Sequence, residues 1–251
     1  MATVIAVVIN AIVLIALLLV VATKAGRGLR ETTVILDNPV KYPWADRLVR
    51  LAFMTMGPVA LFALTLTFIE FIPGPDLIFT LVVPVHLMMI LLGWMFPRLG
   101  RKAFVGFLVG FVATVMYDVV RLLTTYAAGL PDFVPHMGEL MTADANAAPW
   151  VGYAWRLFGN GAGLGIIYAM LPEKWFHTMK GSLIYGEFLN FALLGVLLIY
   201  PVAQLHLVIL TGQAVINSIL GHWAYGLTLF WLYPRAIAYA EYKPGTHRLL
   251  E

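Results

Sequence analysis

Apolar residues gather in seven long uninterrupted runs along this chain, and polar residues fill the gaps between the runs. A helix that crosses a bilayer needs about 20 mostly apolar residues, and each run comes close to that length. Because the runs are continuous and do not alternate in polarity, they predict helices and not the strands of a closed barrel. The seven predicted spans cover residues 2–23, 51–72, 77–96, 103–128, 150–171, 182–199 and 207–232.

The composition also points to lipid as the main solvent. The chain is 61% hydrophobic and 12% charged, whereas soluble domains carry about 25% charged residues. We therefore predict an all-α polytopic integral membrane protein, one bundle over residues 1–251, with the prokaryotic cytoplasmic membrane as its expected location. The chain has no cysteine, which excludes disulfides, thiolate metal sites and cysteine nucleophiles.

The basic residues give the predicted bundle a direction. All but two of the sixteen Lys and Arg residues lie in alternate gaps between the runs, and the other gaps contain none. Basic residues mark cytoplasmic loops, so the pattern predicts an N-terminus outside and a C-terminus in the cytoplasm. The same placement accounts for the net charge of +3 without a nucleic-acid partner.

Two connections are longer than a turn requires. The basic inner segment 24–50 is expected to be partly extended and partly an amphipathic helix on the membrane surface. The outer loop 129–149 contains a short predicted helix over 136–142. The run 2–23 has no basic segment before it and no small-residue cleavage site after it, so we expect it to remain as the first span.

The two remaining arginines belong to a polar group in the outer half of the predicted bundle. Tyr117, Asp118 and Arg121 share one side of the fourth run, and Arg156 and Asn160 share one side of the fifth. Asp118 is expected to pair with either arginine. The simplest interpretation is a structural ion pair, but the surplus positive charge could also meet Glu70, an anionic headgroup or an anionic solute.

A second polar group lies in the inner half. Glu187 and Asn190 share a face of the sixth run, Asn217 and His222 lie on the seventh, and small residues at i+4 spacing around His222 direct it into the bundle. Interhelical hydrogen bonding is the simplest role for these residues. The alternatives are haem or chlorin ligation by His86 and His222, a metal held by both histidines and Glu187, or a proton relay between Glu187 and His222.

Two further motifs have both a structural and a functional interpretation. His136, Met137 and Met141 share the predicted outer-loop helix, and imidazole and thioether ligands suit Cu(I), although methionine also packs readily into cores. The glycine-rich stretch 159–165 lies inside the fifth run. Close helix packing through GxxxG pairs is favoured there over an unwound ion site.

Three functions stay open on this basis. The scarcity of deep charge and of large loops favours a non-enzymatic subunit or scaffold that packs with other membrane proteins or with a second copy in the lipid bilayer. The first alternative is an ion, proton or small-solute transporter that uses both polar groups. The second is a redox or pigment-binding subunit with a histidine-ligated cofactor. No catalytic motif stands out, so an enzyme is disfavoured.

Overall fold

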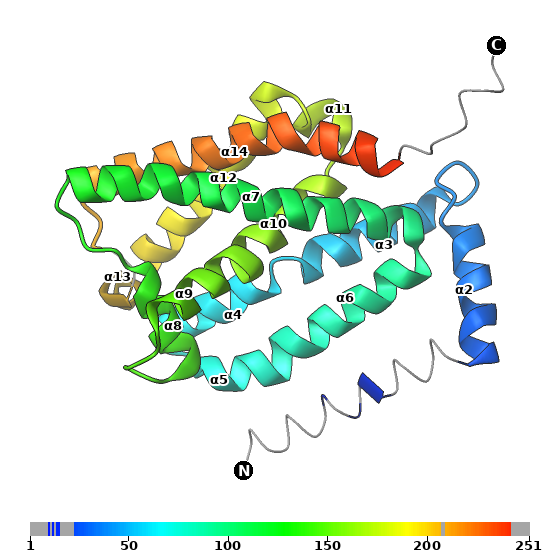
Figure 1. Cartoon of the computed structure of the whole chain (residues 1–251), viewed down its shortest axis with the longest axis horizontal. Helices are drawn as coiled ribbons and strands as arrows, with labels where there is room; N and C mark the ends of the chain where they lie inside the picture. The colour runs from blue at the N-terminus through cyan, green and yellow to red at the C-terminus, as the bar shows by residue number, and fades with distance from the viewer. Residues whose placement is uncertain (1–9, 11, 13, 16–22, 207–208, 242–251) are drawn as a thin grey trace.

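The structure of the chain is a computed structural model that describes residues 10, 12, 14, 15, 23–206 and 209–241 (Figure 1). Over these residues its regular elements are all helices, with no strand. The predicted all-α class is therefore confirmed. Most of the first predicted span, 2–23, lies outside the described residues, as do residues 207 and 208 at the start of the seventh.

Four helices of the described chain are long and apolar enough to cross a membrane, which identifies a membrane protein by length and composition. They correspond to the second, third, fourth and sixth predicted spans. Two of them contain breaks: Gly57 and Pro58 separate α3 from α4, and a π-helical turn joins α5 to α6. The four are Pro43–Phe68 (α3 Pro43–Met56, α4 Val59–Phe68), Gly74–Met95 (α5 Gly74–Leu77, η1 Ile78–Val82, α6 Val83–Met95), Pro97–Ala127 (α7) and Met179–Ile199 (α12).

The fifth and seventh predicted spans are also helical but are not among the four. Their polar residues lower their hydropathy: Arg156 and Asn160 in the fifth, and Asn217 and His222 in the seventh. The seven-span topology is thus supported only in part. The fifth consists of α9 Pro149–Ala154, the π-helix η2 Trp155–Gly161 and α10 Ala162–Met170, and the seventh is α14 Gly212–Glu241.

Helix α7 is the central element, and it packs against both α14 and α10 (Figure 1). Glycines allow α7 and α10 to approach closely. A Cβ placed on Gly165 would lie 2.2 Å from the carbonyl oxygen of Gly106 and 2.5 Å from the Cα of Gly110. The GxxxG pairs therefore form the close helix contact that the sequence predicts.

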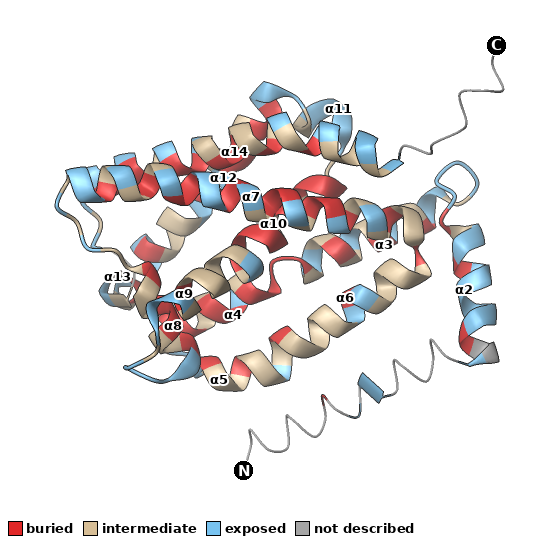
Figure 2. Ribbon diagram, in the orientation of Figure 1, coloured by how far each residue is buried: buried red, intermediate tan, exposed pale blue. Residues whose placement is uncertain are grey.

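Burial follows this arrangement, with buried residues concentrated where α4, α7, α10 and α14 face one another (Figure 2). The outward faces of the same bundle carry large apolar side chains, including Leu123, Phe188 and Phe191, each about two-thirds exposed. A soluble protein rarely leaves so much apolar surface in water, whereas lipid tails solvate it well.

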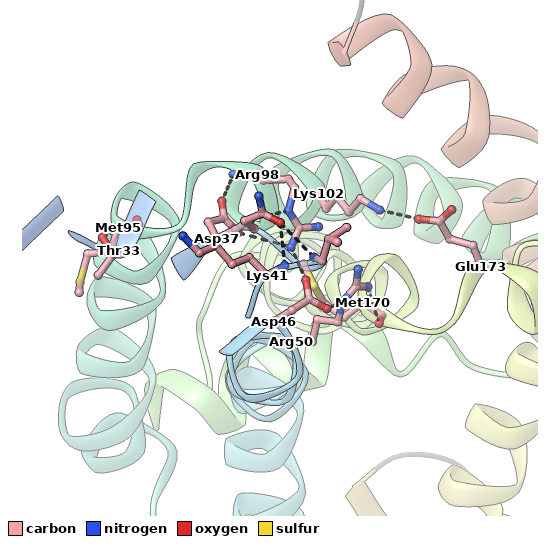
Figure 3. A network of polar contacts seen from close by, with 12 residues as sticks. Thr33, Asp37, Lys41, Asp46, Arg50, Met95, Arg98, Lys102, Met170 and Glu173 are labelled. Atoms are coloured by element: carbon pink, nitrogen blue, oxygen red, sulfur yellow. Dashed lines mark hydrogen bonds and ion pairs between the residues drawn. The ribbon is translucent and has the colours of Figure 1, made fainter. Parts of the chain in front are cut away.

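One end of the bundle is held together by a network of charged side chains (Figure 3). The Oδ2 of Asp37 accepts a 2.7 Å hydrogen bond from the backbone N–H of Arg98, at the start of α7, where a carboxylate also complements the helix dipole. Arg98 bridges Asp37 and Asp46, and the Nε of Arg50 donates to Asp46 at 2.8 Å. The segment 24–50 is thus two helices, α2 Lys24–Leu36 and the start of α3, and Asp37 ties it to the bundle.

The remaining short helices connect the long ones. Residues of α8 and α9 pack on each other beside α4, and α11 leads directly into α12. Helix α8 agrees with the helix predicted at 136–142 within two residues at its start. These connecting helices are α8 Val134–Thr142, α11 Glu173–Phe176 and α13 Pro201–His206.

Candidate functional site

Four charged residues, named here the charge cluster, meet between α7, η2 and the loop after α7: Asp118, Arg121, Asp132 and Arg156. The Oδ1 of Asp118 accepts from the Nε of Arg121 at 2.8 Å and from the Nε of Arg156 at 2.7 Å. The Nη1 of Arg121 donates to the Oδ1 of Asp132 at 2.8 Å. Two carboxylates therefore balance two guanidinium groups inside the protein, where Arg121 is 2% exposed and Asp118 6%.

The sequence predicts the pairing of Asp118 with an arginine but misses Asp132. Glu70, which the sequence offers as a second carboxylate for the two arginines, bonds to His206 instead. Asp132 follows Pro131 in a loop, so no helical periodicity places it beside Arg121, eleven residues earlier. The loop is fixed locally, because Asp132 also accepts hydrogen bonds from the backbone N–H of Val134 and from the hydroxyl of Tyr153.

Asp132 stays ionised because of these contacts. Burial alone raises its pKa, but the hydrogen bond from Tyr153 and the positive charge of Arg121 outweigh burial, so its pKa lies below the ordinary value. Asp132 is therefore a fixed negative charge opposite Arg121.

The π-helix η2 places Arg156 in the wall of a cavity and against the rings of Tyr117 and Phe133. A π-helical turn adds a residue to the helical repeat and occurs frequently at functional sites. From this turn the Cζ of Arg156 stands 4.5 Å from the ring centroid of Tyr117, and 5.9 Å from that of Phe133. Aromatic faces partly replace the water that a buried guanidinium loses.

A cavity of about 290 Å³ adjoins the charge cluster. Helices α4, α7, α12 and α14 and the π-helix η2 form its walls. Most of the lining is apolar, with Leu, Phe and Val side chains from α4 and α12. Most of the polar side chains lie on the walls that α7, η2 and α14 contribute, and they include Arg121, Arg156, Asn160, Asn217, Ser218 and His222.

Two buried polar atoms of the residues that line this cavity have no hydrogen-bond partner in the described structure. They are the Nη2 of Arg121, a donor, and the Oδ1 of Asn160, an acceptor. Buried polar groups are nearly always paired, and each exception calls for an explanation such as a ligand or an ordered water. Both residues line the cavity, so one donor and one acceptor beside it have no partner among the described residues.

The inner polar group joins the same cavity through Asn217 and His222. The Nδ1 of His222 donates to the backbone carbonyl of Ser218 at 2.8 Å, which leaves the lone pair on Nε2. The ring of His222 meets the ring of Tyr117 edge-on, with centroids 4.9 Å apart. Tyr117 therefore lies between His222 and Arg156 and connects the two groups that the sequence places at separate depths.

Of the inner group, Glu187 and Asn190 do not line the cavity. The hydroxyl of Ser218 donates to the Oδ1 of Asn190 at 2.7 Å, and the amide of Asn190 donates to Glu187 at 3.2 Å. A carboxamide does not exchange protons as an imidazole or a carboxyl does, so this chain of bonds orients His222 and is poorly suited to relay protons. Asn217 takes a different role, since its amide donates to Thr125 of α7 at 2.8 Å.

The structure does not assemble the candidate metal ligands into one group. His86 bonds to the carbonyl of Val82 in its own helical turn and does not line the cavity that His222 faces. No group of three or more His, Asp or Glu residues that could hold a metal occurs within the described ranges.

The proposed copper ligands likewise point to different environments. His136 is partly exposed, bonds to Glu139 and stacks on His206. Met137 and Met141 are buried in the apolar core beside α4 and α5. The two methionines therefore act as core residues.

The chain matches no model of a protein family, no curated protein and no solved structure. The fold and the site therefore define its class on their own: an all-helical membrane protein with a buried charge cluster beside an apolar cavity.

Proposed function

We propose that the protein is a non-enzymatic, seven-span protein of the cell membrane that binds a small, largely apolar molecule in the cavity beside the charge cluster. The observation that carries the proposal is the composition of the cavity wall. An apolar lining with a few convergent polar groups is typical of small-molecule sites. The proposed topology, with the N-terminus outside, rests on the alternation of basic and non-basic gaps in the sequence.

The unpartnered atoms favour binding over a purely structural ion pair. A structural cluster gains most when every donor and acceptor is satisfied, because an unpaired buried group costs about 1–3 kcal/mol. Arg121 and Asn160 each keep one such atom in a wall of the cavity. A bound molecule that supplies their partners would recover that cost.

Filling the cavity tests the proposal. Leu193 of α12 lines the cavity, and Leu193→Trp should occupy the space where a ligand would sit. Leu198→Trp is the matched control, because Leu198 lies on the same helix, is 68% exposed and does not line the cavity. Native mass spectrometry of protein purified from membranes should detect a bound small molecule in the wild type and in Leu198→Trp, and none in Leu193→Trp. Equal occupancy in both variants would reject the cavity as the site.

A second function, a subunit that packs with other membrane proteins or a second copy, draws on Glu187. Its Oε1 is buried and has no hydrogen-bond partner within the part of the chain that the structure describes. The residue lies in a groove on the outer surface of α12 and α14, with Phe188, Phe191 and Trp223. A hydrogen-bond donor from a neighbouring helix would satisfy this carboxyl group. Glu187→Leu should then release whatever copurifies with the wild type under mild detergent. An unchanged set of associated chains would count against this role.

A further inference from the structure

The charge cluster restricts the chemistry of the molecule that the cavity accepts, and this inference rests on the proposed function. Arg121 and Arg156 are each bonded to a carboxylate, so the cluster as a whole is neutral. The described lining of the cavity contains no Lys that could balance an anionic headgroup in addition to these two paired arginines. An anionic headgroup would therefore add an uncompensated charge to a buried site, which is costly.

Hydrogen-bonding capacity specifies the polar end further. The Nη2 of Arg121 offers an N–H and requires an acceptor such as a carbonyl oxygen. The Oδ1 of Asn160 and the Nε2 of His222 are acceptors, and the buried Oδ1 of Asn160 requires a donor such as a hydroxyl group. A ligand that satisfies the site carries an acceptor and a donor, a pair that a carbonyl oxygen and a neighbouring hydroxyl group supply.

The position of the cavity specifies the rest of the molecule. Phe62 of α4 and Ala192 of α12 both line the cavity and are both exposed on the outside of the bundle. The cavity thus reaches the lateral surface between α4 and α12, where the hydrocarbon of the bilayer would meet it. An alkyl chain can extend from the cavity into lipid through this opening.

From these three features we infer that the cavity binds a neutral lipid of the acylglycerol type, in which an ester carbonyl faces Arg121 and a glycerol hydroxyl faces Asn160 or His222. An acyl chain lies along the apolar wall of α4 and α12. The phosphorylated form of the same lipid is excluded by its charge, although its chain and ester are identical.

A matched pair of lipids tests this selectivity. Full-length protein in phosphatidylcholine nanodiscs is titrated with 1-oleoylglycerol and, separately, with 1-oleoylglycerol 3-phosphate, and binding is followed by native mass spectrometry. We expect 1-oleoylglycerol to bind at least about tenfold more tightly, a difference equivalent to about 1.4 kcal/mol. Asn160→Leu should weaken 1-oleoylglycerol several-fold, whereas Asn146→Leu, in the exposed loop after α8, should leave it unchanged.

The outcomes distinguish failure of the cavity as a binding site from failure of its selectivity for a neutral lipid. If the phosphate binds as tightly as 1-oleoylglycerol and Leu193→Trp abolishes both, the inference about neutrality is overturned while the cavity remains a binding site. If Leu193→Trp changes the binding of neither lipid, the proposed function fails and the inference fails with it. Selective binding of 1-oleoylglycerol that both Leu193→Trp and Asn160→Leu reduce supports both.

Discussion

Arg156 and Tyr117 lie on separate elements, η2 and α7, yet the guanidinium carbon of Arg156 stands 4.5 Å from the centre of the Tyr117 ring. The same ring meets His222 of α14 edge-on. Tyr117 is buried and its hydroxyl makes no hydrogen bond within the described structure, so its aromatic face carries the contact. One ring thus couples the charge cluster to the histidine in the wall of the cavity.

The Tyr117 contact predicts different outcomes for two substitutions. Tyr117→Phe keeps the aromatic face and should leave the melting temperature nearly unchanged. Tyr117→Leu removes the cation–π contact and should cost about 1–2 kcal/mol, because such contacts are strongest where the cation is desolvated. Thermal unfolding of the two variants in the same detergent measures the difference. Equal destabilisation would show that volume or the hydroxyl, and not the aromatic face, matters.

Removing the charge of Asp118 should have a much larger effect. Asp118 is the common acceptor of Arg121 and Arg156. After Asp118→Asn, Asp132 is the one carboxylate of the cluster that remains, and it pairs with Arg121. Breaking a buried ion pair in this way costs about 3–5 kcal/mol. The control is Asp144→Asn on the exposed loop after α8, which should change stability by less than about 0.5 kcal/mol. A thermal shift for Asp118→Asn no larger than that of the control would show that the arginines find other partners.

The apolar runs predict the helices well because hydrocarbon imposes a strong constraint: a spanning segment must be long, apolar and helical. The same constraint makes nearly every helix face apolar, so the sequence leaves open which faces meet. The pairing of Tyr117 with His222 and the separation of His86 from His222 both depend on that choice. Asp132 lies in a loop, where turn geometry and not periodicity determines its partner.

Because of the close glycine contact between α7 and α10, we expect Gly→Ala to destabilise the protein at that contact and to stabilise it slightly elsewhere. Gly165→Ala would place a methyl group 2.2 Å from the carbonyl oxygen of Gly106, so the helices must separate. Overpacking of this kind costs about 1–3 kcal/mol. Gly195→Ala on α12 is the matched control, since nothing lies within 4 Å of its added Cβ, and higher helix propensity should stabilise it slightly. Unfolding temperatures that fall equally for both would contradict the close contact.

Because of the partly buried His177, we expect the free energy of unfolding to fall in mild acid. The residue lies between α11 and α12, bonds to the carbonyl of Tyr168 and stacks on the Tyr168 ring. Burial lowers its pKa below the ordinary value of 6.5 and outweighs the opposing contributions of the Tyr168 carbonyl and of Glu173. The unfolded chain therefore takes up a proton at His177 before the folded chain does, so the stability from this residue falls as the pH drops below about 6.5.

Comparison of the wild type with His177→Gln measures this contribution. The variant cannot titrate in this range, so its free energy of unfolding should decline less between pH 7 and 5 than that of the wild type. Above pH 7 the two proteins should differ by a constant amount. Parallel curves over the whole range would show that His177 has the same protonation in both states.

The absence of cysteine makes the proposed orientation directly measurable with single introduced thiols. Ala145 lies in the exposed loop after α8, on the side expected outside, and Lys174 is exposed in α11, on the side expected in the cytoplasm. A maleimide that does not cross membranes should label Ala145→Cys in intact cells, and Lys174→Cys only after the membrane is permeabilised. Both positions are surface residues, so neither substitution should disturb the fold. The reverse labelling pattern would invert the topology, and labelling of both in intact cells would show that they share one side of the membrane.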